Sequence, residues 1–345
     1  MNLYLPKMNS SVAFKYLLSL SPVPLVIAGN LSGGVFTMMN AFYGLVIMIF
    51  SEGFLPENKK DNHASPMLSN LILILHPLTL TTCVISFIYG IQSGIISGGW
   101  ILTAAISTGL NSGMAGITSA HELIHRKEKI LRTFGIWNLV LVNYGHFYIE
   151  HIKCHHKLVG TKKDPATARY GESVYQFFFR TVPQQFLSSF KIETIRLRNK
   201  KSSTYSFQNF VLMISFFEII ICILLYYFFG IIILLAFLLQ SFIAVFLLEY
   251  TNYIEHYGLE RNETDRVNAT HSWQSDYLLS RFALIELSRH ADHHYYASKP
   301  FYTLKSYGES PVLPSGYFGS FYTALIPPLW FKKINPIIDR MKISE

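Results

Sequence analysis

Long apolar runs dominate the first 120 residues of the chain and return once in its second half. A helix needs about 20 mostly apolar residues to cross the hydrocarbon core of a bilayer, which is about 30 Å thick. Runs of sufficient length extend over residues 16–50, 68–89, 100–120 and 207–253. The first is interrupted at residues 30–34, and the last is interrupted at Gly230. This pattern predicts six transmembrane helices, four over residues 16–120 and two over residues 207–253.

The polar segments outside these runs carry most of the positive charge. Fifteen of the 29 lysines and arginines lie between Arg126 and Lys201, and ten lie between Arg261 and Lys342. None lies in the short turns within the three pairs of apolar runs. Cytoplasmic loops are enriched in Lys and Arg, and six helices return the chain to its starting side. We therefore expect both termini and the segments 121–206 and 254–345 to be cytoplasmic.

The composition agrees with a membrane protein and excludes several other classes. Half of the residues are apolar and 14% are charged, against about 25% charged residues in an ordinary soluble domain. Buried core helices of a large soluble protein are the alternative, but the run over residues 207–253 contains only Glu218 and Glu249 as charged residues. The three cysteines are scattered and form no CxxC pair. This excludes a disulfide framework, a cysteine-rich zinc module and a built-in iron–sulfur centre.

The net charge of +8 is concentrated in one segment. Residues 119–206 contain 15 basic and 6 acidic residues, a local charge of +9. In a membrane protein such a segment suits an anionic inner leaflet or an acidic protein partner. We do not expect a nucleic acid partner.

Histidine carries the chemistry of this chain. Nine of the thirteen histidines lie in four clusters, which are HELIH (His121, His125), EHIKCHH (His151, His155, His156), NYIEHYG (His256) and RHADHH (His290, His293, His294). Residues three or four apart on a helix share one face, with Cβ atoms about 5–6 Å apart. This spacing lets three pairs each share one metal ion, namely His121/His125, His151/His155 and His290/His294. The predicted topology brings all four clusters to the same side of the membrane.

Nine imidazoles exceed the needs of a single metal ion. A zinc site takes four protein ligands, or three and a water when it is catalytic. Two ions with four or five nitrogen ligands each would use the whole set. A ligating histidine usually donates its other ring N–H to a carboxylate or carbonyl group. Acids adjacent to the clusters are candidates for this role or are simply solvated, and they are Glu122, Glu150, Glu255 and Asp292.

The remaining four histidines have simpler interpretations. His63 and His76 stand alone in the sequence, so we interpret each as a loop residue or as a buried side chain with satisfied hydrogen bonds. For His146 and His271, which lie outside the helical spacing, a supporting or structural role is favoured over metal ligation. The spacing of Asp164 and Arg169 allows a structural ion pair near the clusters.

These motifs resemble those of the integral-membrane alkane hydroxylases, a family within the wider group of membrane fatty-acid desaturases and hydroxylases. The matching segments are HELIHRKE, GHFYIEHIKCHH followed by DPATARYGES, NYIEHYGL, HSWQSD, and LSRHADHH followed by PSGYFG and IPPLWF. The three histidine boxes are shared with desaturases, whereas NYIEHYGL and DPATARYGES narrow the match. The first 100 residues match the family only in hydropathy.

The resemblance implies a single all-α integral-membrane domain over residues 1–345, in which a cytoplasmic helical cap holds a histidine-rich di-metal site. It implies that the nine clustered histidines bind two non-haem iron ions and that no other side chain acts as a nucleophile or general base. The implied reaction is O₂-dependent hydroxylation of the terminal methyl group of a medium- or long-chain alkane. Electrons would come from a separate rubredoxin and its reductase, and the location would be the bacterial inner membrane.

Some positions depart from the family pattern or from an apolar channel. Cys154 stands where relatives usually have Gly, and we favour space-filling over metal binding or oxidation. The segment from Glu260 to Thr270 looks shorter than in typical members. An acid within a span is costly and often functional, so Glu218 suggests a hydrogen bond between helices or, less favoured, a polar group on the substrate. Chain-length preference depends on which of several bulky side chains close the substrate channel, although such residues more often face lipid or pack against other helices. The candidates are Phe36, Met38, Met39, Phe42 and Tyr43.

Other functions compete with this interpretation. HELIH satisfies the HExxH motif of zinc proteases, but that function leaves seven clustered histidines without a role. A metal transporter or storage protein is the second alternative, yet no matching set of polar residues crosses the predicted midplane of the bilayer. A desaturase, a fatty-acyl hydroxylase or a hydroxylase of alkylaromatic methyl groups would use the same kind of metal site. Only the substrate channel would distinguish these enzymes.

Overall fold

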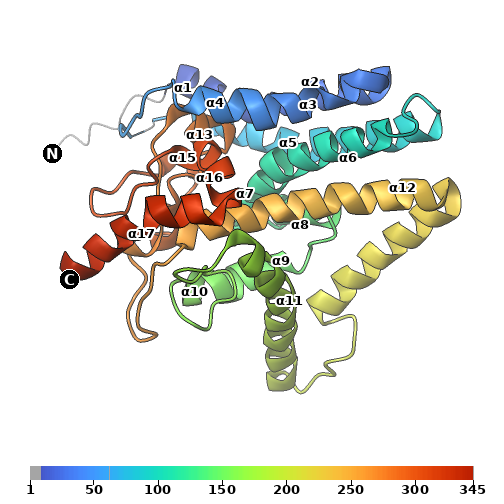
Figure 1. The fold of residues 1–345 in the computed structure, drawn as a ribbon. Coiled ribbons are helices and arrows are strands. Elements are labelled where there is room, and N and C mark those ends of the chain that lie inside the picture. The colour runs from blue at the N-terminus through green and yellow to red at the C-terminus, as the bar shows by residue number, and fades with distance from the viewer. Residues whose placement is uncertain (1–8, 62, 345) are drawn as a thin grey trace.

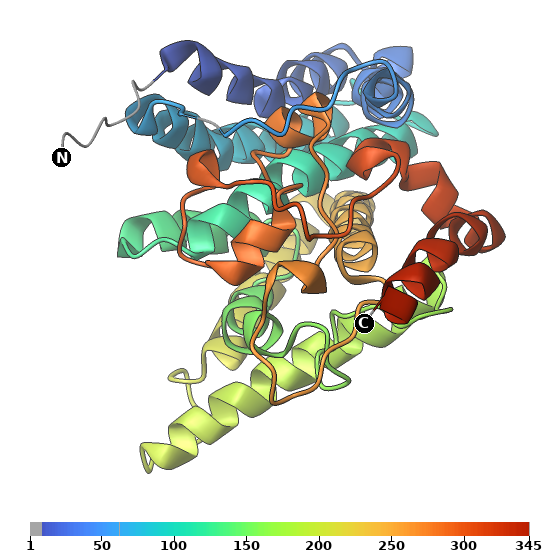
Figure 2. The same cartoon turned by 90° about the vertical axis from the view of Figure 1, so that its left-hand side faces the viewer.

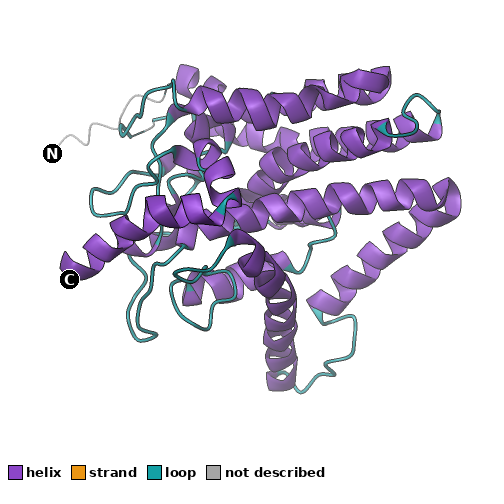
Figure 3. Ribbon diagram, in the orientation of Figure 1, coloured by secondary structure: helices purple, strands orange, loops and turns teal. Residues whose placement is uncertain are grey.

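The computed structural model describes residues 9–61 and 63–344, and helices joined by loops build this part of the chain. Figure 3 shows no β-strand among the described residues. The predicted all-helical class is therefore confirmed. The predicted cytoplasmic position of the N-terminus falls on residues 1–8, which lie outside the described residues.

Four helical segments are long and apolar enough to cross a membrane. The first, Ser10–Ser32, contains α1 (Ser10–Lys15), a 3₁₀ turn (Tyr16–Leu20) and α2 (Pro22–Ser32). The second, Gly34–Glu52, contains a 3₁₀ turn (Gly34–Met38), α3 (Met39–Phe42), a π-helical segment (Tyr43–Met48) and α4 (Ile49–Glu52). The third is α5 (Pro66–Gln92), and the fourth is α12 (Phe210–His256). These segments identify the chain as a membrane protein.

The break predicted at Gly230 is present within α12. Gly230 has φ 82° and ψ 177°, a conformation that an L-residue with a side chain rarely adopts. The two arms of α12 consequently form the V seen in Figure 1. We call Phe210–Phe229 the first arm and Ile231–His256 the second arm.

The predicted fourth span forms a helix but is not among the four candidate segments. It comprises α6 (Trp100–Asn111), a π-helical segment (Ser112–Ile117) and α7 (Thr118–Ile124). Polar residues such as Asn111 and Ser112 interrupt its apolar sequence, and both are buried against neighbouring helices. The count of six spans therefore remains a prediction, whereas five of the predicted spans coincide with candidate segments or arms.

Short helices and loops form a cap at the end of the apolar helices where α4, α7 and α12 finish (Figures 1 and 2). Between α7 and α12 the chain forms α8 (Lys129–Val140), α9 (Phe147–Glu150), a π-helical segment (His151–His155), α10 (His156–Leu158) and α11 (Val174–Asn199). Figure 1 shows α11 running across the direction of the apolar helices. After α12 come α13 (Leu278–Ala283), α14 (His290–Tyr295), α15 (Gly316–Gly319), α16 (Phe321–Leu325) and α17 (Pro327–Ser344).

Buried acids connect the cap to the apolar helices through hydrogen bonds. Glu52, at the end of α4, accepts hydrogen bonds from the backbone N–H groups of Ser280 (3.2 Å) and Gly319 (2.7 Å). Glu286, in the cap, accepts a hydrogen bond from the hydroxyl of Tyr16 in the first helical segment (3.2 Å) and pairs with Arg281 of the cap (2.8 Å). Glu52, Arg281 and Glu286 are fully buried. Removing Arg281 or Glu286 would leave the charge of its partner buried and uncompensated, which is strongly destabilising.

The α6 helix and the second arm of α12 approach each other closely at two glycines of the fourth predicted span. A Cβ atom at Gly109 would lie 2.7 Å from the carbonyl oxygen of Gln240 and 2.8 Å from Cβ of Ile243. At Gly113 it would lie 2.8 Å from Cδ1 of Leu247. Small residues allow helices in membranes to pack backbone to backbone.

We predict that Gly109→Ala lowers the thermal unfolding temperature of the detergent-solubilised protein. The added methyl group must push the two helices apart, and overpacking of this kind costs about 1–3 kcal/mol. Gly99→Ala is the matched control, because a Cβ atom there meets nothing within 4 Å. Equal unfolding temperatures for the two variants would contradict the close contact.

Candidate metal centre

The structure brings all nine clustered histidines together at the junction of the cap and the apolar helices. Ring nitrogens from five of them lie within 4.8 Å of one another, and this first group is His121, His125, His151, His156 and His293. Ring nitrogens from the other four form a second group under the same limit, and these are His155, His256, His290 and His294. The expected convergence therefore occurs, and the set divides into five and four.

In the first group the Nε2 atoms face one another. Nε2 of His151 lies 3.0 Å from Nε2 of His125, and Nε2 of His156 lies 3.1 Å from Nε2 of His125 and of His293. Nε2 of His121 is buried and has no hydrogen-bond partner among the described residues. Unprotonated nitrogens directed at a common point are the arrangement that a divalent metal ion requires.

The second group repeats this arrangement. Nε2 of His290 lies 3.2 Å from Nε2 of His256 and 2.9 Å from Nε2 of His294. The fourth member, His155, has a buried Nε2 without a hydrogen-bond partner in the described part of the chain. The donor set of each group therefore fits a metal ion.

A π-helical segment decides which histidines share a group. His151 and His155 are four residues apart, and α-helical spacing places them on one face. The segment His151–His155 is instead a π-helix, whose i to i+5 hydrogen bonds bring residues five apart together. As a result His151 pairs with His156, with 3.0 Å between their Nε2 atoms, and His155 belongs to the second group. The pairs His121/His125 and His290/His294 each remain within one group.

Burial favours the neutral, metal-binding form of several of these imidazoles. Burial, followed by the neighbouring imidazole of His155, lowers the pKa of His125 to about 3. Burial is also the main cause that lowers the pKa well below its usual range for His151, His156, His290, His293 and His294. Metal ions bind the unprotonated ring nitrogen, so the protein environment prepares the groups for binding.

Asp164 is a site residue that the sequence spacing failed to identify. Its Oδ2 lies 2.9 Å from Nδ1 of His155, so the expected ion pair between Asp164 and Arg169 is replaced by a carboxylate–histidine contact. Asp164 also accepts hydrogen bonds from the hydroxyl of Thr167 (2.6 Å) and the N–H of Ala166 (3.1 Å). The sequence signal for a structural role of Asp164 was the DPAT turn, in which Asp164 precedes Ala166 by two residues. Asp commonly accepts a hydrogen bond from the backbone two residues further on.

Of the four acids proposed to orient ligands, Glu255 contacts a clustered histidine, at the ring nitrogen that faces the other rings of its group, and Glu122 pairs with an arginine. Glu255 Oε2 lies 3.2 Å from Nε2 of His290, and Tyr317 donates a hydrogen bond to its other oxygen (2.9 Å). Glu122 pairs with Arg126 (2.7 Å) rather than with a ligand ring, and burial raises its pKa to about 7.

The other two acids, Asp292 and Glu150, have different surroundings. Asp292 pairs with Lys299 and accepts from the N–H of Lys305 (2.7 Å) and the hydroxyl of Tyr307 (3.1 Å), so its recorded contacts order the loop after α14. Glu150 is fully buried within 4.8 Å of Asp164 and Cys154. Burial raises the pKa of Glu150 well above its usual range.

Cys154 is buried and accepts a hydrogen bond from the hydroxyl of Ser188 (3.2 Å). Burial, followed by the charge of Glu150, raises its pKa to about 12. A thiolate is the form that binds metal and oxidises, so these surroundings favour the space-filling interpretation of Cys154.

The four remaining histidines lie outside both groups. The His76 ring contacts the carbonyl of Ile72 (2.9 Å) and the hydroxyl of Ser19 (3.0 Å), which confirms a satisfied buried side chain. His63 is an exposed loop residue. His271 acts through its backbone, because its carbonyl oxygen faces Nδ1 of His256 at 3.4 Å. His146 precedes α9 and packs against Tyr144.

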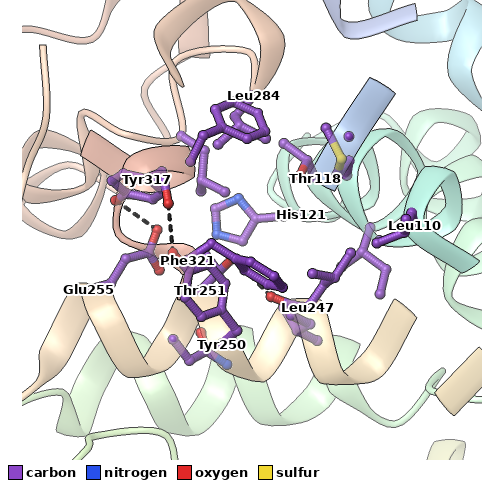
Figure 4. Close-up of a pocket in the computed structure, with 18 of the residues that line it drawn as sticks. Leu110, Thr118, His121, Leu247, Tyr250, Thr251, Glu255, Leu284, Tyr317 and Phe321 are labelled. Atoms are coloured by element: carbon purple, nitrogen blue, oxygen red, sulfur yellow. Dashed lines mark hydrogen bonds between the residues drawn. The ribbon is translucent and has the colours of Figure 1, made fainter. Parts of the chain in front are cut away.

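An apolar pocket reaches the first histidine group. Figure 4 shows the His121 ring pointing into it between Leu284 and Thr251. Two of the π-helical segments line the pocket, one through Gly44 and Leu45 and the other through Gly113, Met114 and Ile117. The bulky side chains considered as candidates for closing the channel do not line this pocket, and they are Phe36, Met38, Met39, Phe42 and Tyr43. Phe36 and Phe42 are more than half exposed, at 54% and 58%.

Fold and site together define a helical membrane protein with histidine groups suited to metal binding. A family model described as fatty acid desaturase matches residues 98–321. The chain is 34% identical over 324 residues to alkane 1-monooxygenase 1 of Pseudomonas aeruginosa, which covers 88% of this chain and 84% of that protein. It therefore belongs to the fatty acid desaturase family and, within it, to the alkane 1-monooxygenases, which are oxygenase oxidoreductases.

Further relatives agree with this placement. Alkane 1-monooxygenase 2 of Alcanivorax borkumensis is 37% identical over 256 residues, which cover 73% of this chain and 65% of that protein. The xylene/toluene monooxygenase hydroxylase component of Pseudomonas putida is 27% identical over 321 residues, which cover 90% of this chain and 86% of that protein.

We predict that Asp164→Ala weakens metal binding by about 10-fold to 100-fold, the usual effect of removing a group that orients a ligand histidine. Competition with a chelator would measure the change. Glu263→Ala serves as the control, because Glu263 is an exposed acid that pairs with Lys163 at the surface near this loop. An affinity equal to that of the unaltered protein would show that Asp164 does not orient His155.

Proposed function

We propose that this chain hydroxylates the terminal methyl group of a medium- or long-chain alkane, using two iron ions held by the nine clustered histidines. The observation that carries the proposal is the pair of all-imidazole groups at the end of an apolar pocket. The names of its relatives add the type of reaction. In this assignment His121, His125, His151, His156 and His293 bind one ion, and His155, His256, His290 and His294 bind the other.

Iron bound at this centre would supply the activation of O₂ and the oxidation of the C–H bond. The overall reaction converts an alkane, O₂, two electrons and two protons into an alcohol and water. Two electrons must therefore enter for each turnover. The three cysteines of the chain form no CxxC pair that could hold an electron-transfer centre. We propose that a rubredoxin, reduced by its own reductase, delivers the electrons.

The residues of the chain hold the reactants in place. Leu110, Ile117 and Leu247 line the pocket with apolar side chains, which exclude water and accept a hydrocarbon chain. The His121 ring marks the end of the pocket at which the reacting carbon must arrive. The Nδ1 contacts of His155 with Asp164 and of His256 with the His271 carbonyl hold those two rings in fixed orientations.

The proposed location is the bacterial inner membrane, with six spans and with the cap on the cytoplasmic side. The positions of Lys and Arg support this orientation, because these residues concentrate in segments 121–206 and 254–345. Cytoplasmic loops are enriched in both residue types. The apolar substrate would enter from the bilayer, and O₂ and electrons would arrive from the cytoplasm.

A second candidate activity is hydroxylation of a methyl group on an alkylaromatic substrate. The relative from Pseudomonas putida named as a xylene/toluene monooxygenase component aligns over 90% of the chain. Fatty-acyl hydroxylation and desaturation belong to the same range of chemistry. The shape of the pocket, rather than the metal centre, would separate these activities.

We predict that the purified protein binds two iron ions and that His293→Ala abolishes hydroxylation while the protein still inserts into membranes. Metal analysis and mass spectrometry of products would test this, with alkanes, fatty acids and alkylaromatics supplied together with a rubredoxin system. His63→Ala is the control, because His63 is an exposed loop residue outside both groups. One zinc ion per chain, or full activity of His293→Ala, would contradict the assignment.

We predict that Gly44→Leu shortens the longest alkane that the enzyme converts. The Cβ atom at Gly44 would meet only Sδ of Met114, at 3.6 Å, so a larger side chain can be accommodated and extends into the pocket. The measurement is the product yield across a series of alkane lengths. A uniform loss at every length would show that the substitution harms the fold or the centre instead of the pocket.

A further inference from the structure

The turn that precedes α9 is held by polar side chains of both arms of α12. We call residues Leu141–Gly145 the ligand turn, because the helix that begins after it carries His151, His155 and His156. The backbone N–H of Gly145 donates a hydrogen bond to Oε1 of Glu218 at 2.7 Å. Glu218 lies on the first arm and is 8% exposed.

The second arm also forms hydrogen bonds with the ligand turn. The side-chain amide of Gln240 donates to the carbonyl of Leu141 (2.9 Å), and the amide of Asn143 donates to the hydroxyl of Ser241 (3.1 Å). The hydroxyl of Tyr144 donates to Oε1 of Glu249 (2.8 Å). Polar groups within an apolar helix are costly unless they are paired, and here several of them are paired to one short turn.

Packing around Gly145 shows that the turn has no freedom to shift toward the first arm. A Cβ atom at this position would lie 2.5 Å from Cγ1 of Ile214 and 2.9 Å from Oε1 of Glu218. The backbone therefore sits directly against the helix at the point where Glu218 binds it.

Aromatic stacking transmits the position of the turn to a metal ligand. The ring of Tyr144 lies 6.1 Å from that of Phe147 with an interplanar angle of 28°. The ring of Phe147 lies 4.9 Å from that of His151 with an interplanar angle of 23°. A shift of the ligand turn would therefore move the imidazole of His151.

We infer that Glu218 is a positioning residue, which fixes the helix carrying His151, His155 and His156 by anchoring the ligand turn to the first arm of α12. The inference rests on the metal centre proposed above. It accounts for an acid inside an apolar segment by a contact with the protein backbone, and it assigns Glu218 no contact with the substrate.

Cobalt(II) binding to the full-length protein in detergent or nanodiscs tests this inference separately from hydroxylation. We expect Glu218→Leu to weaken cobalt affinity about tenfold, in the range found for residues that support metal ligands, and to change the visible absorption spectrum of the bound ion. Glu218→Gln retains a carbonyl oxygen that can accept from Gly145, so it should keep the affinity and spectrum of the unaltered protein.

Ser215→Ala is the matched control, because Ser215 lines the same intramembrane cavity as Glu218 and makes none of the contacts described above. If Glu218→Leu fails to fold by circular dichroism, Glu218→Asp carries the test, since its shorter side chain withdraws the carboxylate from the N–H of Gly145 and keeps an acid at this position. It should also alter the cobalt spectrum.

Two results would overturn the inference. One is a cobalt affinity and spectrum of Glu218→Leu, or of Glu218→Asp if that variant carries the test, equal to those of the unaltered protein. The other is an unchanged cobalt site in Glu218→Leu combined with a larger loss of turnover on an oxygenated chain than on an alkane, which would place Glu218 at the substrate. Normal cobalt binding without alkane hydroxylation would contradict only the proposed function. The cobalt results for the variants would still decide whether Glu218 is a positioning residue.

Discussion

The constraint on which this structure depends is the confinement of nine imidazoles in a small volume at the junction of the cap and the apolar helices. Protonated rings at such distances would repel one another, and burial of the charge would add to the cost. Burial lowers the pKa of most of these rings, as for His125 at about 3. A neutral imidazole keeps one unprotonated nitrogen, which is the form that binds a metal ion. The arrangement is therefore suited to metal binding.

This volume is enclosed partly by the apolar helices and partly by the cap. The apolar helices supply α7 and the end of α12, which bring His121, His125 and His256 to one end of the bundle. The cap supplies the rest, and buried ion pairs hold its own segments together. Arg289, which precedes α14 directly, pairs with Asp276 (3.2 Å) and donates to the backbone carbonyls of Leu304 (2.6 Å) and Lys60 (2.8 Å).

Periodic and compositional signals were sufficient to predict the parts of the molecule that depend on local sequence. The apolar runs gave the helical class, Gly230 marked the break in α12, and the clusters identified the nine histidines that meet. The number of spans remains open because Trp100–Ala120 mixes apolar with small and polar residues. Its polar side chains, such as Asn111, are buried against neighbouring helices.

Contacts between distant segments could not be predicted in this way. Asp164 contacts His155 because the DPAT turn folds back on the helix. The spacing of the two residues along the chain did not predict this contact. The pocket is lined by Gly44 and Met114 rather than by Phe36 or Phe42, because sequence does not fix the rotation of a helix about its axis. The second arm of α12 also presents Gln240 and Glu249 to the ligand turn, a relationship visible only once the helices are packed.

The π-helical segments have a consequence for how this protein can change during evolution. A π-helical turn holds one more residue than an α-helical turn, so it is equivalent to a single-residue insertion that the helix has absorbed. In the segment His151–His155 that extra residue sets the register that separates His155 from His151 and His156. Losing one residue there would rotate every later side chain of the helix. We therefore expect side chains around this segment to change during evolution far more readily than its length.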